Sequence, residues 1–181
     1  MFLALYFMGL TAEACEAPLE LAEVNQYLEQ SSSAMKNMDA TQAGLLLKSI
    51  GNTIGCLSEP VSPEFASEYY LMKGILLWGA GKQNASIRYF DAAKSISPDI
   101  GIDTNIFPQQ HEIHIFFKVV QVSTETVIIE PLDDFETYYF DGVETNERPT
   151  ERPTIFQKKK DDVVIFTDIV TKNETLGGAT D

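Results

Sequence analysis

Two cysteines are the residues whose chemistry this sequence suggests most directly. Cys15 follows an apolar leader that ends in Ala12-Glu13-Ala14, and Cys56 closes the second helix of an expected helical hairpin. Because antiparallel helices of similar length bring their outer ends together, the two thiols could be oxidised to a disulfide. An even cysteine count in an exported chain favours such a bridge. The alternative is two unrelated thiols, one of them buried in a helix interface.

The histidine pair His111 and His114 is a second candidate for chemistry. On a helix, residues three apart share a face, so both imidazoles could bind one metal ion. A metal site needs further ligands, and the side chain of Glu112 points elsewhere on a helix or a strand. The sequence therefore favours two exposed connector histidines over a metal site.

Carboxylates gather around Pro131, at Glu130, Asp133, Asp134 and Glu136. Calcium takes several carboxylate ligands, but this spacing matches no calcium-binding loop, so a solvated turn is favoured. The sequence contains no serine elbow, activated cysteine–histidine pair or phosphate-binding loop. We therefore expect a protein that is not an enzyme and has no cofactor.

The formal net charge of the 181 residues is −14. Binding to nucleic acid or to an anionic membrane surface requires clustered lysine and arginine, so the charge argues against both. The only basic cluster is Lys158-Lys159-Lys160, which Asp161 and Asp162 follow directly. This stretch predicts a solvated turn between two strands.

Residues 1–14, MFLALYFMGLTAEA, are apolar and end in a small-x-small pattern. This pattern is typical of the second half of a secretory signal peptide, and the stretch is too short to span a bilayer. The alternative is a buried N-terminal helix. Cys15 could also accept a lipid, although Glu13 fits poorly with the small residues that such a site needs. The leader predicts a periplasmic or secreted protein without a transmembrane segment in its mature form.

Apolar residues at three- and four-residue spacings predict a helical hairpin over residues 17–57. Glu59-Pro60-Val61-Ser62-Pro63 breaks this pattern, because each proline disfavours helix in the residue before it. Ser62 and Pro63 then start a third helix that runs to about Gly79. A fourth helix is expected from about Asn84 to Ile96. The stretch 109–121 fits a helix or a strand, and we favour a helix.

The third and fourth helices carry residues at a characteristic spacing, namely Tyr70, Gly74, Gly81, Phe90, Ala93 and Pro98. The span from Ser67 to Ile100 thereby resembles one tetratricopeptide (TPR) repeat, a helix-turn-helix unit of about 34 residues. Lys73 stands where a leucine is usual, and Ser86 replaces a small alanine. The resemblance implies stacked hairpins whose concave face binds a protein or peptide partner. Our candidate partner-binding residues are Tyr69, Lys73, Trp78 and Arg88.

From residue 122 onward the pattern changes to strands, expected at 124–130, 137–140, 155–157 and 163–166. Asp141-Gly142 predicts a turn, and the tetrapeptide Glu-Arg-Pro-Thr occurs twice in tandem over 147–154. This order of strands, turn and proline loop resembles a PEGA-type β module of bacterial envelope proteins. Tyr138 or Tyr139 could then stack on the sugars of peptidoglycan or another glycan.

These observations predict an α+β protein with four segments. They are a signal peptide over 1–14, a TPR-like helical domain over 15–121, a PEGA-like antiparallel β-sandwich domain over 122–172 and a disordered tail over 173–181. We expect a non-enzymatic adaptor, in the periplasm or on the cell surface, that binds a protein or peptide partner through the helices. The alternative is a cell-wall or glycan-binding protein that acts through its β domain.

Overall fold

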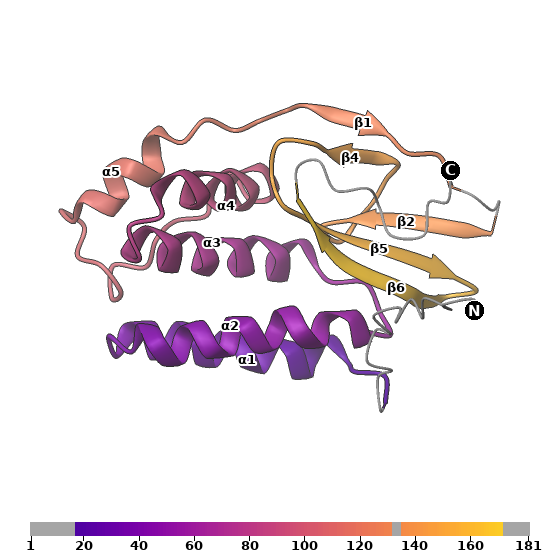
Figure 1. The fold of residues 1–181 in the computed structure, drawn as a ribbon, viewed down its shortest axis with the longest axis horizontal. Helices are drawn as coiled ribbons and strands as arrows, with labels where there is room; N and C mark the ends of the chain where they lie inside the picture. Colours follow the sequence, from indigo (N-terminus) through magenta and orange to yellow (C-terminus); the bar gives the residue numbers. More distant parts are fainter. Residues whose placement is uncertain (1–16, 132–134, 172–181) are drawn as a thin grey trace, which may run out of the picture.

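The structure is a computed structural model, and it describes residues 17–131 and 135–171. Helices form the first part of the chain and antiparallel strands in two sheets form the rest, so the predicted α+β class is confirmed (Figure 1). The expected signal peptide, Cys15, Asp133, Asp134 and the tail lie outside the described residues. Within the described ranges, no helix is long and apolar enough to cross a membrane.

The helical part consists of two antiparallel hairpins followed by a shorter helix (Figure 1). Its elements are α1 (Leu21–Lys36), α2 (Ala40–Thr53), the 3₁₀ helix η1 (Ile54–Cys56), α3 (Pro63–Gly79), α4 (Gln83–Ile96) and α5 (Glu112–Val119). Helices α2 and α3 both begin at a capping side chain, and Ser62 confirms the predicted start of α3. Asp39 accepts a hydrogen bond from the Gln42 amide at 2.9 Å, and Ser62 accepts one from the Phe65 amide at 3.1 Å.

Helix α3 lies at the centre of the helical core and approaches α4 closely. The ring of Phe90 packs against Gly74, where an added Cβ would lie 3.2 Å from Cγ of that ring. Ser86 donates a hydrogen bond to the Gly74 carbonyl at 2.8 Å and is fully buried. Gly74 therefore permits the close helix contact that its place in the sequence pattern predicts.

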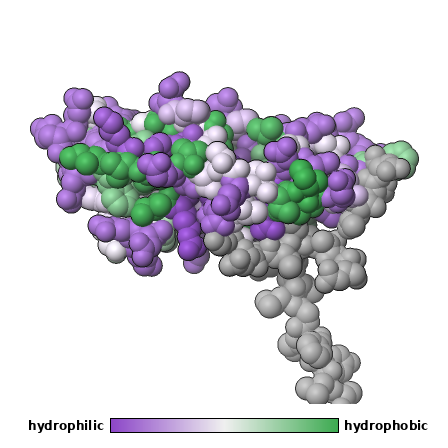
Figure 2. Space-filling view, turned by 90° about the horizontal axis from the view of Figure 1, so that it is seen from above, coloured by the Kyte–Doolittle hydropathy of each residue, from purple (hydrophilic) through white to green (hydrophobic). Residues whose placement is uncertain are grey.

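Helix α5 confirms the helix predicted within residues 109–121. Its buried residues Ile113 and Phe117 belong to the helical core, and the ring of Phe117 meets that of Phe90 of α4 edge-on at 5.0 Å between centroids. Its outer face exposes Ile115 and Val119. Seen from above, apolar side chains form patches on this side of the molecule among hydrophilic ones (Figure 2).

The strands form a two-stranded sheet in the order β1-β4 and a four-stranded sheet in the order β3-β2-β5-β6. Their bounds are β1 (Thr126–Ile128), β2 (Glu136–Phe140), β3 (Val143–Glu144), β4 (Glu147–Pro149), β5 (Thr154–Lys160) and β6 (Val163–Val170). One face of the larger sheet buries a small cluster around Tyr138, Phe140 and Phe156. Ile155 of the same sheet is part of the helical core.

The three lysines do not form the predicted solvated turn, so that prediction is wrong. Lys158 lies on β5, is only 9% exposed, and has its Nζ 3.9 Å from Oε2 of Glu136 and 5.7 Å from the ring centroid of Tyr138. The turn is formed by Asp161 and Asp162, both with positive φ. Pairing with β2 places Lys158 opposite Tyr138 and beside a carboxylate, which allows the lysine to be buried.

The segment between the two hairpins attaches the larger sheet to the helices. Gln157 of β5 is fully buried; its Oε1 accepts a hydrogen bond from the Val61 amide at 2.8 Å and its Nε2 donates to the Glu59 carbonyl at 3.3 Å. The Val164 amide of β6 donates to the Ser58 carbonyl at 3.2 Å. Helices and sheet therefore share buried polar contacts as well as the helical core.

Gly142 provides the first test of this junction. Its φ is +83°, and a Cβ would clash with the Val61 carbonyl oxygen and lie 2.9 Å from the Pro63 nitrogen. Gly142→Ala should lower the free energy of unfolding by about 3 kcal/mol, because backbone strain adds to the steric clash. Urea denaturation measures the loss.

The matched control is Gly79→Ala, at the exposed end of α3. A Cβ there meets no atom within 4 Å, so this variant should be neutral or slightly stabilising. Equal effects of the two alanine substitutions would show that Gly142 does not constrain the junction.

Candidate partner-binding site

Tyr69 of α3 is one of the predicted partner-binding residues and lies almost entirely inside the protein. It is 2% exposed, and its ring stacks on Phe65 at 6.3 Å and meets Tyr70 at 5.6 Å. Burial raises the pKa of its hydroxyl above the ordinary tyrosine value. Tyr69 therefore supports the site from beneath and offers little surface to a partner.

Lys73 lies one turn further along α3, with its ammonium over the Tyr69 ring at 5.8 Å from the centroid. The side chain is half-buried and has no ion pair or hydrogen bond with any described residue. Burial lowers the pKa of the Lys73 ammonium, because the charged form loses part of its hydration. A half-buried cation with no acidic partner is an unusual feature in a protein of net charge −14.

Lys73 lines a hollow of about 850 Å³, which we name the first hollow. The start of α2, the second half of α3 and the start of α4 form its walls. Its lining residues are Met35, Ala40, Thr41, Gly44, Lys73, Ile75, Leu76, Leu77, Gly79, Ala80, Lys82, Ala85, Tyr89 and Phe107. Two of these residues are lysines and none is acidic, so the first hollow has apolar walls and a positive charge.

The remaining two predicted residues lie in different places. Arg88 is exposed on α4 and lines a separate hollow of about 320 Å³ next to the loop before β5. Trp78 lines neither hollow, because its ring packs edge-on against Phe107 at 6.1 Å and against His111 at 5.3 Å. The structure thus brings Lys73 and Arg88 to neighbouring hollows and places Trp78 against the connector before α5.

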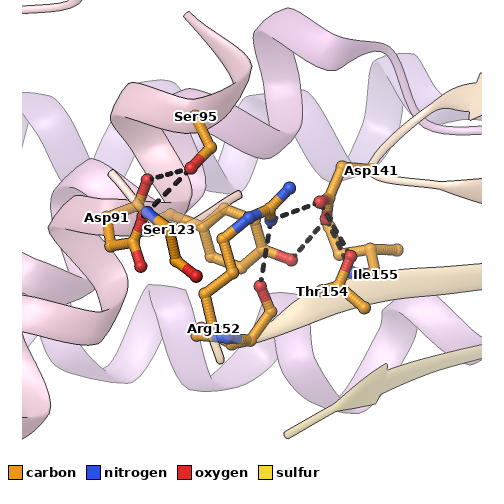
Figure 3. A network of polar contacts seen from close by, with 9 residues as sticks. Asp91, Ser95, Ser123, Asp141, Arg152, Thr154 and Ile155 are labelled. Atoms are coloured by element: carbon orange, nitrogen blue, oxygen red, sulfur yellow. Dashed lines mark hydrogen bonds and ion pairs between the residues drawn. The ribbon is translucent and has the colours of Figure 1, made fainter. Parts of the chain in front are cut away.

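The largest feature that the sequence did not predict is a buried network around Asp141 (Figure 3). The Oδ1 atom of Asp141 accepts hydrogen bonds from the Tyr70 hydroxyl at 2.7 Å and from the Ile155 amide at 2.8 Å. Its Oδ2 atom accepts from Arg152 at 2.6 Å and from the Thr154 hydroxyl at 2.7 Å. Asp141 is 2% exposed, so these four donors replace the water that a carboxylate normally binds. Burial and the nearby Asp141 charge raise the pKa of Tyr70, which remains a neutral donor.

A second network holds the connector that leads from α5 to β1. Oδ1 of Asp91 accepts hydrogen bonds from the Ser95 hydroxyl and from the Ser123 amide, both at 3.0 Å (Figure 3). Lys94 donates to the Val120 carbonyl at 2.7 Å. This lysine is therefore occupied by backbone carbonyls and is not free for a ligand.

Each of the two histidines makes a hydrogen bond to the backbone near the start of α5. Nδ1 of His111 accepts a hydrogen bond from the Ile113 amide at 3.3 Å, and Nε2 of His114 lies 2.9 Å from the Phe107 carbonyl oxygen. Both are half-buried, so the expectation of exposed histidines is wrong. Across the described residues, no group of three or more histidine, cysteine, aspartate or glutamate side chains could hold a metal ion.

Cys56 is the last residue of η1 and is half-buried. It is not a free thiol in the structure. Its predicted partner, Cys15, lies outside the described residues, so the Cys15–Cys56 disulfide stays a prediction.

No protein-family model matches this chain, and no curated protein or solved structure shows significant similarity to it.

The Asp141 network yields a prediction about stability. Asp141→Asn replaces the buried carboxylate by an amide and leaves the guanidinium of Arg152 without its counter-charge. We expect the free energy of unfolding to fall by about 3–5 kcal/mol, which is typical for breaking one side of a buried ion pair. Tyr70→Phe removes one donor and should cost about 1–2 kcal/mol.

Chemical denaturation of both variants is compared with Asp168→Asn, which makes the same change on the exposed edge of β6. The free energy of unfolding of this control should stay within about 0.5 kcal/mol of that of the unsubstituted protein, because Asp168 is exposed. If Asp141→Asn were as mild as Asp168→Asn, the network would not stabilise the fold.

Proposed function

We propose that this protein is a non-enzymatic adaptor that binds an acidic segment of a partner protein in the first hollow. The observation that carries the proposal is the half-buried Lys73, which lines an apolar hollow together with Lys82; none of the described residues that line this hollow is acidic. A partly desolvated cation is unfavourable unless an opposite charge approaches it. A carboxylate from a partner would supply that charge.

The shape and polarity of the first hollow support a polypeptide ligand. Its volume of about 850 Å³ is in the range of ligand-binding clefts, and Leu76 and Leu77, which are partly exposed, offer apolar contact beside the two lysines. Helix α4 begins at its edge, and the cap residue Lys82 makes no side-chain hydrogen bond there. The amide groups and the dipole of this helix start favour a negative charge as well.

The TPR-like arrangement of the helices, the export of the protein and the PEGA-like strands are part of the same proposal. Two stacked antiparallel hairpins are the arrangement that a TPR-like array would need, and such arrays bind partners in grooves between their helices. The apolar leader before Cys15 supports export, and the half-buried Cys56, which is not a free thiol, supports an oxidising compartment such as the periplasm or the cell exterior. The resemblance of the strands to a PEGA module supports a place in a bacterial envelope.

Glycan binding through the strands was the alternative. Tyr138 is 3% exposed and is packed against Phe156, so it has no free ring face for a sugar. Tyr139 is half-buried, and its hydroxyl donates a hydrogen bond to Glu144 at 3.0 Å. No observation on the described residues favours a glycan ligand over a polypeptide.

Charge reversal in the first hollow tests the proposal. The probe is a fluorescein-labelled peptide of alternating leucine and glutamate, measured by fluorescence anisotropy. Lys73→Glu and Lys82→Glu should each weaken its binding by about tenfold or more, which corresponds to about 1.4 kcal/mol. A peptide with glutamine in place of glutamate should bind weakly to every variant.

Lys48→Glu is the matched control, because Lys48 is exposed on α2 outside the hollow and its reversal changes the net charge equally. Equal binding by Lys73→Glu and Lys48→Glu would contradict the proposal. Lys73→Met separates binding from folding: it should abolish the preference for the acidic peptide and leave the protein at least as stable, since a partly desolvated charge is removed.

A further inference from the structure

A second hollow of about 320 Å³ lies where α4 meets the residues that precede β5. Its lining residues are Asn84, Ala85, Arg88, Tyr89, Glu151, Arg152, Pro153 and Thr171. Two arginines therefore line it, Arg88 from the helical part of the chain and Arg152 from the β part. Two arginines in one small hollow are suited to carboxylates, which accept paired hydrogen bonds from a guanidinium.

The two hollows are neighbours along α4. Ala85 and Tyr89 line both of them, and these residues are four apart in the sequence, which places them about 6 Å apart along the helix. An extended polypeptide advances by about 3.3 Å per residue, so a few residues would reach from one hollow to the next.

Arg152 is held in place before any ligand arrives. One terminal nitrogen of its guanidinium donates to Asp141 at 2.6 Å and to the Pro153 carbonyl at 3.3 Å, and the side chain is 8% exposed. The remaining guanidinium nitrogens form no hydrogen bond with described residues. Donors fixed in advance lose little conformational entropy on binding, which favours affinity.

Arg88 supplies the exposed cation of the second hollow. It is exposed and has no ion pair or hydrogen bond with any described residue. Among the described residues that line this hollow, Glu151 is the one acidic residue, and it already has a contact within the protein. Asp141 is the counter-charge of Arg152, so the guanidinium of Arg88 is the charge in this hollow without a counter-charge among the described residues.

We propose that the acidic segment bound in the first hollow continues across Ala85 and Tyr89 into the second hollow, where Arg88 and Arg152 bind a further carboxylate. The ligand is thus an acidic polypeptide with carboxylates in two places, and it contacts both the helical and the β part of the protein. This inference rests on the proposed function, because it extends the same bound segment.

The test uses two fluorescein-labelled peptides and fluorescence anisotropy on the full chain. The long peptide has two Leu-Glu-Glu units joined by Gly-Ser, and the short peptide has one unit. Arg88→Glu should weaken binding of the long peptide by about tenfold and change binding of the short peptide by less than about twofold. Lys73→Glu should weaken both. Arg88→Gln serves as a milder variant, and Lys48→Glu is again the control.

The outcomes separate this inference from the proposed function. If Lys73→Glu weakens both peptides and Arg88→Glu weakens neither, the second hollow does not bind the segment and the adaptor proposal stands. If Arg88→Glu weakens both peptides alike, the two hollows do not bind successive parts of one segment, and the inference is overturned. If Lys73→Glu weakens neither peptide, the adaptor proposal fails and the inference fails with it.

Discussion

The buried carboxylate of Asp141 is the interaction on which the junction between helices and strands depends. A charge withdrawn from water must be satisfied by protein donors, and Asp141 has four of them from α3, from β5 and from the loop before β5. The contact between Tyr70 and Asp141 joins residues 71 positions apart. Next to it, Gly142 lies against the backbone of Val61 and Pro63, so the turn and the segment between the hairpins fit together only in this arrangement.

The same junction holds residues of the proposed binding surface in place. Asp141 holds Arg152 at the wall of the second hollow, and the ring of Tyr70 lies 6.1 Å from that of Tyr89, which separates the two hollows. Several other lysines of the chain are already occupied: Lys36 pairs with Asp103, Lys159 pairs with Asp162, and Lys94 binds backbone carbonyls. Lys73 and Arg88 have no such partner among the described residues, which is the basis of the proposed binding of an acidic segment.

Local sequence signals predicted the elements well and the junction poorly. The Ser62-Pro63 pair, the Asp39 cap and the Asp141-Gly142 turn act on their own neighbours, so their patterns are visible in the sequence. The hydrogen-bond partners of Asp141 include Tyr70 from a distant segment, and no local sequence pattern predicts such a pairing. Three lysines in a row predict a solvated turn, whereas strand pairing places Lys158 beside Glu136.

The candidate site was predicted in part, for a similar reason. Lys73 was visible as a lysine in place of a usual leucine, and its half-buried position in the first hollow agrees with that anomaly. Nothing in the sequence marks Lys82 as a binding residue, because a lysine in the turn between two helices is ordinary. The sequence predicts Tyr69 and Trp78 as partner-binding residues, and only the packing shows that Tyr69 is buried and that Trp78 meets Phe107 and His111.

Two-dimensional NMR of the isotope-labelled protein, titrated with the long acidic peptide, would locate the binding surface through changes in amide chemical shifts. If the peptide binds across the two hollows, the largest changes cluster at residues 79–89 and at 151–152, on the walls of the hollows. Changes confined to α5 and β1, or no saturable change at all, would contradict this proposal.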